Sequence, residues 1–357
     1  MISIAKPIIA QEEIDAAVAA LKSGALTGGP LIESFEKELA LYHGYKHAVA
    51  VSSGTAALHV LMHSAGLHAG DEIIVPDFTF IATANAARYV GAVPRFCDVD
   101  EKTFNIDVSK AEKLVTPKTK AIIPVSLYGQ AYNVDAVKEF AEKHSLLVLS
   151  DQCQAIGTKW RGSRNLHDQA MTLSFYPTKN LTTMEGGAVL TDDDGIAEEC
   201  RLWRNIGQRK PYDYAHLGYN YRLTTVAAAI GSAQLKKLDS FTQKRRENAR
   251  ILNELLADIV EIPFEDERAE HVYHQYTIKT QKRDELKQFL AENGVGSNVY
   301  YPVPLHTLPT FASTDACPIT ERLCKTVLSL PIHPLVTHDD LQLIAEKVKE
   351  FIETKLL

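Results

Sequence analysis

Between residues 47 and 193 the sequence alternates short apolar runs with longer amphipathic segments, and this alternation constrains the fold most. Short apolar runs bounded by turn residues are typical of strands buried on both faces, and their alternation with helices is typical of a parallel sheet. The pattern therefore predicts an α/β fold with a mostly parallel central sheet covered by helices. Strands are expected at residues 47–53, 71–76, 92–99, 120–129, 146–155, 170–177 and 186–193, and helices at 54–66, 79–91 and 134–145.

Toward the C-terminus the pattern changes to a mixture of helices and strands. Residues 224–259 predict one long helix with a kink near Gly231. A chain of 357 residues is also longer than one hydrophobic core usually serves. We expect a large α/β domain over residues 1–240 and a smaller α+β domain over residues 241–357. The N-terminal helix expected at residues 11–24 is a candidate for packing on the small domain.

Composition and charge indicate which binding partners and which cellular location to expect. The chain has 38 basic and 45 acidic side chains, a net charge of −7, which argues against a nucleic-acid binder and a basic membrane-surface protein. No apolar run approaches the ~20 residues needed to span a bilayer, and the N-terminus lacks a signal-peptide core. The five cysteines have no zinc-site spacing and suit free thiols in a reducing compartment. We expect a cytoplasmic protein with no metal.

Polar residues follow several expected strands, where parallel sheets place their ligands. Ser53, Gly54 and Thr55 lie at a strand-to-helix junction. The free N–H groups of a helix start suit a phosphate, and glycine allows a close approach. Taken alone, the same stretch also suits an ordinary serine N-cap. No GxxxxGK[ST] or GxGxxG motif follows a strand, so nucleoside triphosphate and dinucleotide sites lack their usual support.

Two further strands end in candidate ligand contacts. Asp151 closes a very apolar strand, and Gln154 follows three residues later. A carboxylate there needs a partner, which can be a helix cap, a salt bridge or a cationic ring nitrogen of a ligand. Phe78 and Phe80 follow another strand. Each can be an ordinary core residue, or one of them can offer a flat face that stacks on a planar ligand.

Lys179 stands in the uncharged stretch "SFYPTKNLTTM", between an apolar strand and a turn. A lysine in a partly desolvated pocket has a lowered pKa, and its neutral amine can form a Schiff base. By itself it can equally be a solvated turn residue. A phosphate cradle, an aromatic face, a carboxylate and this lysine together are the parts of a pyridoxal phosphate site.

These stretches resemble the DegT/DnrJ/EryC1/StrS family of sugar aminotransferases, essentially from end to end. The resemblance implies the pyridoxal-phosphate-dependent aspartate aminotransferase fold (type I) and a homodimer that shares its active sites. The matching motifs are "SGTAAL", "VPDFTFIATANA", "AIIPVSLYGQ", "SDQCQAIG", "SFYPTKNLTTMEGGAVLTDD", "GYNYRLTTVAAAIGSAQLKKLD", "YYPVPLH" and "LSLPIHP".

The resemblance also implies a role for each matching residue. Lys179 bonds to the cofactor aldehyde and later moves a proton, while Asp151 pairs with the pyridine nitrogen. The other implied cofactor contacts are Gln154 at the ring hydroxyl, Phe80 on the ring face, Gly54, Thr55 and Ser174 at the phosphate, and Asn220 at the phosphate of the partner subunit. The variable substrate loop of the family supplies the substrate candidates, which are Tyr300, Tyr301 and His306.

The implied activity is transfer of an amino group from an amino acid, glutamate in this family, to a keto sugar. The sugar is most often nucleotide-linked, the cofactor alternates between pyridoxal and pyridoxamine phosphate, and the kinetics are ping-pong. A free or eight-carbon keto sugar is an alternative acceptor. A pyridoxal-phosphate-dependent sugar dehydratase and a non-catalytic regulator are alternative functions. Lys179 disfavours the dehydratase, because such relatives have histidine in place of the lysine.

Two positions depart from the family pattern. Met184 stands where glycine is usual, which predicts a reshaped loop after the lysine. Asp151 lies in "SDQCQA", where "EDAAQA" is commoner. The spacing between Asp151 and Gln154 is kept, so their contacts to the cofactor are expected to survive.

Overall fold

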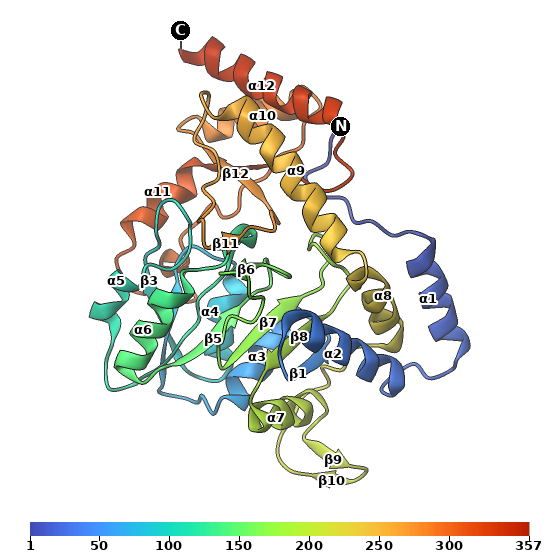
Figure 1. The fold of residues 1–357 in the computed structure, drawn as a ribbon. Helices are drawn as coiled ribbons and strands as arrows, with labels where there is room; N and C mark the ends of the chain where they lie inside the picture. The colour runs from blue at the N-terminus through green and yellow to red at the C-terminus, as the bar shows by residue number, and fades with distance from the viewer. Residues whose placement is uncertain (357) are drawn as a thin grey trace.

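The computed structural model describes residues 1–356 and is built around one seven-stranded sheet (Figure 1). The strand order is β1-β8-β7-β5-β4-β2-β3. The bounds are β1 His47–Val51, β2 Glu72–Pro76, β3 Val93–Cys97, β4 Thr119–Ile122, β5 Leu147–Asp151, β7 Ala170–Ser174 and β8 Gly187–Thr191. Only β8 runs antiparallel to its neighbours β1 and β7. The predicted mostly parallel sheet is therefore confirmed, with all seven strands where the apolar runs placed them.

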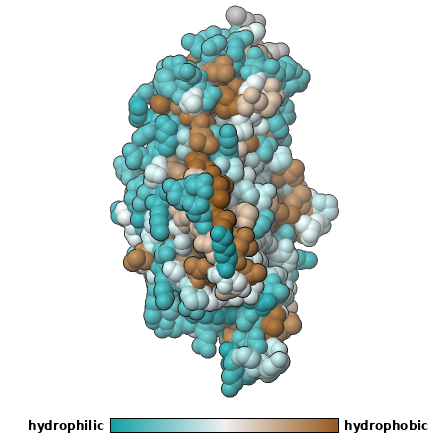
Figure 2. Space-filling model, turned by 90° about the vertical axis from the view of Figure 1, so that its right-hand side faces the viewer, coloured by the Kyte–Doolittle hydropathy of each residue, from teal (hydrophilic) through white to brown (hydrophobic). Residues whose placement is uncertain are grey.

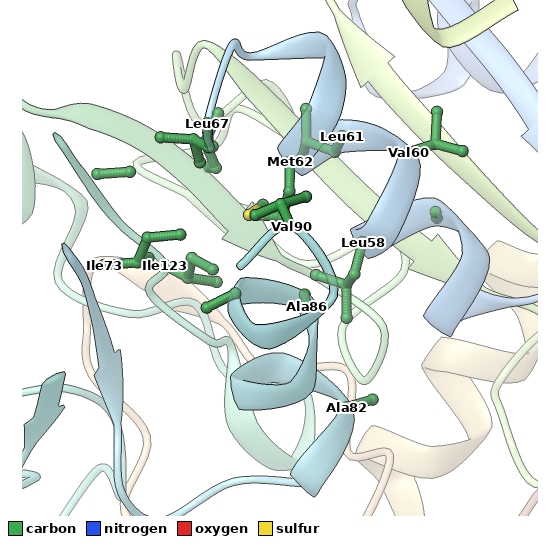
Figure 3. Close-up of a cluster of buried hydrophobic side chains, with 14 of the residues drawn as sticks. Leu58, Val60, Leu61, Met62, Leu67, Ile73, Ala82, Ala86, Val90 and Ile123 are labelled. Atoms are coloured by element: carbon green, nitrogen blue, oxygen red, sulfur yellow. The ribbon is translucent and has the colours of Figure 1, made fainter. Parts of the chain in front are cut away.

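Helices cover both faces of the sheet, because alternate residues of each strand point to opposite faces. On one face Val49, Val75 and Leu149 pack under α3 (Gly54–Ser64), α4 (Ile81–Tyr89) and α7 (Asp194–Arg204). Figure 3 shows part of this core, with Leu58 and Met62 of α3 and Ala86 of α4 turned toward one another. This packing fixes the start of α3 at the end of β1.

The opposite face carries a second core. Ala48 and Leu173 pack under α2 (Pro30–His43) and α8 (Thr225–Leu235). Further along this face, Ile122 and Val148 pack against α6 (Val134–His144). Two short helices, α5 (Val108–Ala111) and η1 (Glu112–Leu114), and the turn η2 (Leu127–Gly129) complete this part.

The C-terminal part has its own core beside the sheet. An antiparallel pair, β12 (Tyr276–Lys279) and β13 (Val327–Leu330), packs against α9 (Leu238–Leu256), α10 (Arg283–Glu292) and α12 (His338–Leu356). The segments η3 (Leu305–Thr307) and α11 (Pro318–Thr326) lie between α10 and β13 in the chain. The boundary expected at residue 240 falls in the first turn of α9, and the division into two domains stays a prediction.

Two short strand pairs lie outside the main sheets. Strand β6 (Lys159–Trp160) pairs with β11 (Ala269–Glu270), so it ties the central sheet region to the C-terminal part. Strands β9 (Gln208–Lys210) and β10 (Asp213–Tyr214) form a hairpin that projects from the molecule at the foot of Figure 1. No helix among residues 1–356 is long and apolar enough to cross a bilayer.

The N-terminal segment lies differently from the expectation. Helix α1 (Gln11–Lys22) packs against α8 at the right of Figure 1, and not on the C-terminal part. Only the residues before the helix reach the C-terminal part, where Ile2 pairs with Val295. Helix α1 stays with α8 because Glu13 is buried there and accepts a hydrogen bond from Gln234.

The expected kink near Gly231 is also wrong. The chain breaks between α8 and α9 at Lys236 and Lys237, whereas Gly231 lies inside α8. A Cβ atom at Gly231 would lie 2.5 Å from Cζ of Phe35 on α2. The glycine therefore serves close packing of two helices and does not bend the chain.

Candidate active site

The carboxyl ends of β1, β5 and β7 lie at the same edge of the sheet, and a cavity of about 620 Å³ opens there. Ligands bind at this edge in open parallel sheets. The C-terminal part closes the cavity from above. Its lining residues are Ser53, Gly54, Thr55, Leu58, Phe80, Ala82, Asp151, Cys153, Gln154, Ser174, Tyr176, Thr178, Lys179, Glu185, His274, Gln275, Tyr300 and Tyr301.

Lys179 lies at the cavity wall, in the turn that follows β7, and its backbone N–H donates to Tyr176 O at 2.9 Å. Burial lowers the pKa of the Lys179 amine below its usual 10.5, while Cys153 and Asp151 act in the opposite direction. Desolvation favours the neutral amine. The side chain is therefore suited to react as a nucleophile in the cavity.

Asp151 ends β5 and is buried at the cavity floor. Its Oδ2 atom accepts a hydrogen bond from Thr83 Oγ1 at 2.8 Å, and its Oδ1 atom accepts one from Cys153 N at 3.0 Å. These bonds fix the carboxylate but bring no positive charge. Because a buried carboxylate is costly without a cation, Asp151 suits a protonated ring nitrogen of a ligand.

The start of α3 forms one wall of the cavity. Ser53 caps this helix by accepting a hydrogen bond from Ala56 N at 3.0 Å, so the first N–H groups at Gly54 and Thr55 remain for a ligand. A Cβ atom at Gly54 would lie 2.7 Å from Cβ of Ser174. The missing side chain therefore keeps the helix start close to Ser174, as a phosphate cradle requires.

Phe78 and Phe80 lie in different environments, one in the core and one at the cavity. Phe78 is 1% exposed and packs in a core cluster with Phe104. Phe80 is 51% exposed, lines the cavity, and its ring centre lies 5.9 Å from that of Tyr301. Only Phe80 offers a ring face to a ligand.

Gln154 links the sheet edge to the C-terminal part. Its Oε1 atom accepts from Tyr128 N at 3.1 Å, and its Nε2 atom donates to the Tyr301 hydroxyl at 3.0 Å. The neighbouring Tyr300 also lines the cavity, and its carbonyl accepts a hydrogen bond from the Tyr128 hydroxyl. The two tyrosines are thus held against the cavity by bonds to the sheet side.

His306 does not line the cavity, although the sequence placed it among the substrate candidates. It is 8% exposed, and both its backbone N–H and its Nδ1 atom bond to the carboxylate of Asp77 at 2.7 Å. Ligand atoms of Asp77, His306 and Cys317 lie within 4.8 Å of one another, but the two Asp77 oxygens are already used by His306. His306 therefore anchors the loop that carries Tyr300 and Tyr301.

Asn220 also lies outside this cavity, on an exposed segment that pairs with Asn205. Such a position leaves it open to a second subunit, as the resemblance implies. Its contact with a partner's cofactor stays a prediction.

Met184 adopts a left-handed backbone conformation, with φ of 73°, and is exposed. It follows the lysine loop without lining the cavity. The loop is closed instead by Thr182, whose Oγ1 accepts from Met184 N at 3.0 Å.

Several lining residues carry no signal in the sequence. His274 and Gln275 come from the segment before β12, nearly a hundred residues after Lys179, and no local motif marks them. Cys153 and Glu185 lie close in the sequence to predicted site residues, and this closeness was the only indication that they line the cavity.

A second cleft, of about 660 Å³, lies between α9 and the β6–β11 pair. Its cations are already paired, Lys159 with Glu270 at 2.9 Å and Arg164 with Asp239 at 2.8 Å. Its one lysine amine is held by a carboxylate, and we place the chemistry in the first cavity.

The first cavity fits pyridoxal phosphate. The close approach of Gly54 to Ser174 suits the phosphate. The buried Asp151 carboxylate suits the ring nitrogen, and the partly desolvated Lys179 suits the aldehyde. Fold and cavity together define a pyridoxal-phosphate-dependent aminotransferase of the aspartate aminotransferase type.

Sequence comparison gives the family directly. The family model described as "DegT/DnrJ/EryC1/StrS aminotransferase family" matches residues 7–349, and the chain belongs to this family. A "Pleiotropic regulatory protein" of Geobacillus stearothermophilus is 42% identical over 93% of this chain and 92% of the relative. A "GDP-perosamine synthase" of Caulobacter vibrioides is 38% identical over 95% of both chains.

Solved structures agree with the fold and the cofactor. The crystal structure of S. venezuelae DesV with a ketimine intermediate has a TM-score of 0.93 and 36% identity, over 96% of this chain and 94% of that one. The PLP-form of a putative sugar aminotransferase from Streptococcus pneumoniae has a TM-score of 0.94 and 27% identity, over 100% of this chain and 99% of that one. The chain is thus a sugar aminotransferase that uses pyridoxal phosphate.

Proposed function

We propose that the protein transfers an amino group from L-glutamate to a keto sugar that is linked to a nucleotide, in the biosynthesis of an amino sugar. The observation that carries the proposal is the partly desolvated Lys179 amine beside the buried Asp151 carboxylate in one cavity. Relatives named for GDP-linked and dTDP-linked sugars support a nucleotide on the acceptor. A free keto sugar remains the alternative acceptor.

Each of the cavity residues has a separate role in the proposed reaction. Pyridoxal phosphate, when bound, supplies an electron-withdrawing ring that stabilises negative charge at the α-carbon of the donor. Asp151 keeps a proton on the ring nitrogen, because a carboxylate beside a pyridinium raises the pKa of that nitrogen. Nζ of Lys179 would take the α-proton of the donor and pass it to the cofactor carbon that keeps the amino group. Phe80, Tyr300 and Tyr301 line the cavity, where they would limit the access of water to a bound ring.

Donor and acceptor use the same cavity in turn, so ping-pong kinetics are expected. Double-reciprocal plots at several fixed acceptor concentrations should give parallel lines. Intersecting lines would mean that both substrates bind together, which one cavity of this size would not explain.

We propose further that two subunits complete each active site. Tyr212, in the turn of the β9–β10 hairpin, is 90% exposed, and Leu217, on the segment that leads from the hairpin to Asn220, is 72% exposed. Figure 2 shows hydrophobic residues gathered along the face that carries α1, where Ile14 and Leu21 are exposed. Large exposed apolar areas favour contact with another chain. A cytoplasmic location, expected from the sequence, stays a prediction.

A non-catalytic regulator is the second candidate, because the Geobacillus relative is named a regulatory protein. A regulator does not need a reactive lysine beside a buried carboxylate, and this chain has both. Regulation can also coexist with catalysis, so the name of the relative does not exclude an enzyme.

One experiment separates the two candidates. The protein is purified with pyridoxal phosphate, reduced with borohydride and digested, and the modified peptide is mapped. We expect the pyridoxyl group on Lys179, and loss of the visible absorbance when L-glutamate is added before reduction. Absorbance that does not respond to any amino acid would favour the regulator.

A further inference from the structure

His274 is the most unusual polar side chain in the cavity wall. It lines the cavity and is only 6% exposed, yet its Nδ1 atom has no hydrogen-bond partner within residues 1–356. Its Nε2 atom lies 3.5 Å from Nε2 of Gln275, which also lines the cavity and is 5% exposed. A buried polar atom without a partner is costly unless a ligand or water meets it.

The segment that carries His274 is held rigidly. Gln275 N donates to Tyr128 O at 3.1 Å, and the buried Arg245 of α9 donates from Nη1 to the carbonyls of Tyr273 at 3.0 Å and His274 at 3.4 Å. No carboxylate pairs with Arg245 in the described part of the chain, and its Nε atom has no partner. A positive charge therefore stands uncompensated directly behind His274.

This charge sets the state of the imidazole. Burial, and then the nearby basic groups Lys179 and Arg245, hold the pKa of His274 well below its usual 6.5. The ring is therefore neutral, while the guanidinium group of Arg245 lies against its backbone carbonyl. A neutral hydrogen-bonding group in a positive environment favours an anionic partner without carrying a charge of its own.

A cavity that binds two substrates in turn must accept groups of different charge at the same position. An amino acid brings an α-carboxylate next to the reacting carbon, whereas a keto sugar brings neutral hydroxyls there. An arginine in direct contact would be left buried and unpaired in the second half of the reaction, at a high cost. Among the described residues that line the cavity, none is an arginine.

We propose that His274 and Gln275 bind the α-carboxylate of the amino donor, with Arg245 supplying the positive potential from behind. The inference rests on the proposed aminotransfer. The α-carboxylate is bonded to the carbon at which Lys179 acts, so it must lie near that amine, where His274 stands. The same neutral groups can bond to sugar hydroxyls afterwards, because imidazole and amide both donate and accept.

The test compares two ligands that cannot be turned over. Neither 2-methyl-L-glutamate nor 4-amino-4-methylpentanoate has a hydrogen on the carbon that bears the amine, and the second has a methyl group where the first has the α-carboxylate. Their dissociation constants are measured by calorimetry with the holoenzyme, for the wild type and for His274→Ala, His274→Gln and Gln275→Ala.

We expect His274→Ala and Gln275→Ala each to weaken 2-methyl-L-glutamate on the order of 10- to 100-fold, as for a lost hydrogen bond to a charged group. His274→Gln keeps an amide donor and should lose less. None of the variants should change binding of 4-amino-4-methylpentanoate appreciably. The matched control is His43→Ala, since His43 is also buried with an unpartnered ring nitrogen but lies away from the cavity.

Two results would overturn the inference: unchanged binding of 2-methyl-L-glutamate in the variants, or equal weakening of both ligands. A wild type that binds neither ligand would overturn it too. Circular dichroism shows whether each variant is folded. If His274→Ala is unfolded, the binding measurements with Gln275→Ala serve as the test. Conversion of L-glutamate by the wild type is followed separately by absorbance. Its failure would remove the aminotransfer and leave the carboxylate site standing.

Discussion

In the proposed mechanism Lys179 and Asp151 act together, and the fold holds both residues at one partly buried cavity. The lysine is separated from the carboxylate by 28 positions in the chain, and β5 and β7 bring them to the same edge by lying side by side. Three single substitutions test this pair and the glycine opposite it.

Replacing Lys179 by alanine should abolish turnover and leave the fold intact. The side chain packs no core, so its removal costs little stability, while the amine has no replacement in the cavity. Turnover is measured with L-glutamate and a keto sugar, and folding by circular dichroism. Substantial remaining aminotransfer would remove Lys179 from the mechanism.

The variant Asp151→Asn should lower the catalytic rate by several orders of magnitude. The amide oxygen can still accept from Cys153 N, and the amide nitrogen can donate to Thr83 Oγ1, so the packing survives, but the amide cannot hold a proton on a ring nitrogen. The measurement is the rate of the L-glutamate half-reaction in a single turnover. A rate near that of the wild type would make Asp151 a purely structural residue.

The variant Gly54→Ala should weaken binding of pyridoxal phosphate at least about 10-fold, because the new Cβ pushes the start of α3 away from Ser174. Affinity is measured by titrating the apoprotein and following absorbance. The matched control is Gly195→Ala in the first turn of α7, far from the cavity, which should leave the affinity unchanged. Equal affinities for both variants would argue against a phosphate at Gly54.

At the scale of elements, the two edges of the sheet differ in the residues they hold. The candidate active site lies at the carboxyl ends of the strands, while the opposite edge holds a buried carboxyl group with a structural role. Asp168 lies just before β7, is buried, and accepts a hydrogen bond from the Tyr132 hydroxyl. Burial raises the pKa of Asp168 from 3.8 to about 7.

This shift makes the stability depend on pH. The folded state favours the protonated carboxyl group of Asp168. The contribution of this group to the free energy of unfolding is therefore fully present below pH 3.8 and is lost as pH rises through about 7. Relative to the wild type, Asp168→Asn should gain about 2–3 kcal/mol of unfolding free energy between pH 5 and pH 8. Urea unfolding at the two pH values measures this gain. A difference independent of pH would mean that Asp168 is ionised in the folded protein.

At the scale of the whole molecule, the active site belongs to neither part of the chain alone. The sheet edge supplies Lys179 and Asp151, and the C-terminal part supplies His274, Tyr300 and Tyr301. If Asn220 of a second subunit completes the site, the assembly has to be tested as a dimer.

Two inactive variants should restore each other. Lys179→Ala has no lysine of its own, and Asn220→Ala should have weak cofactor binding. In a mixed dimer, Lys179 of the second chain and Asn220 of the first form one native site. Random pairing should then restore about a quarter of the wild-type activity. No recovery after mixing and refolding would place Asn220 in the site of its own chain or in none.

Most of the fold and the sheet-edge part of the site could be predicted because their signals are local. A buried strand needs consecutive apolar residues, and the residue that follows it is known at once, which gave Gly54, Asp151, Ser174 and Lys179. The break between α8 and α9 and the packing of α1 were missed, since both depend on which surface a helix meets.

By itself, the sequence determined the parallel sheet, the order of its strands along the chain and the candidate reactive groups at the strand ends, since these follow from periodicity and from adjacency. Only the tertiary structure decided that Phe80 and not Phe78 faces the cavity, that His306 bonds to Asp77 outside it, and that His274 enters it. Those outcomes depend on contacts between residues far apart in the chain. Such contacts are settled by how the two parts pack, and no local pattern records them.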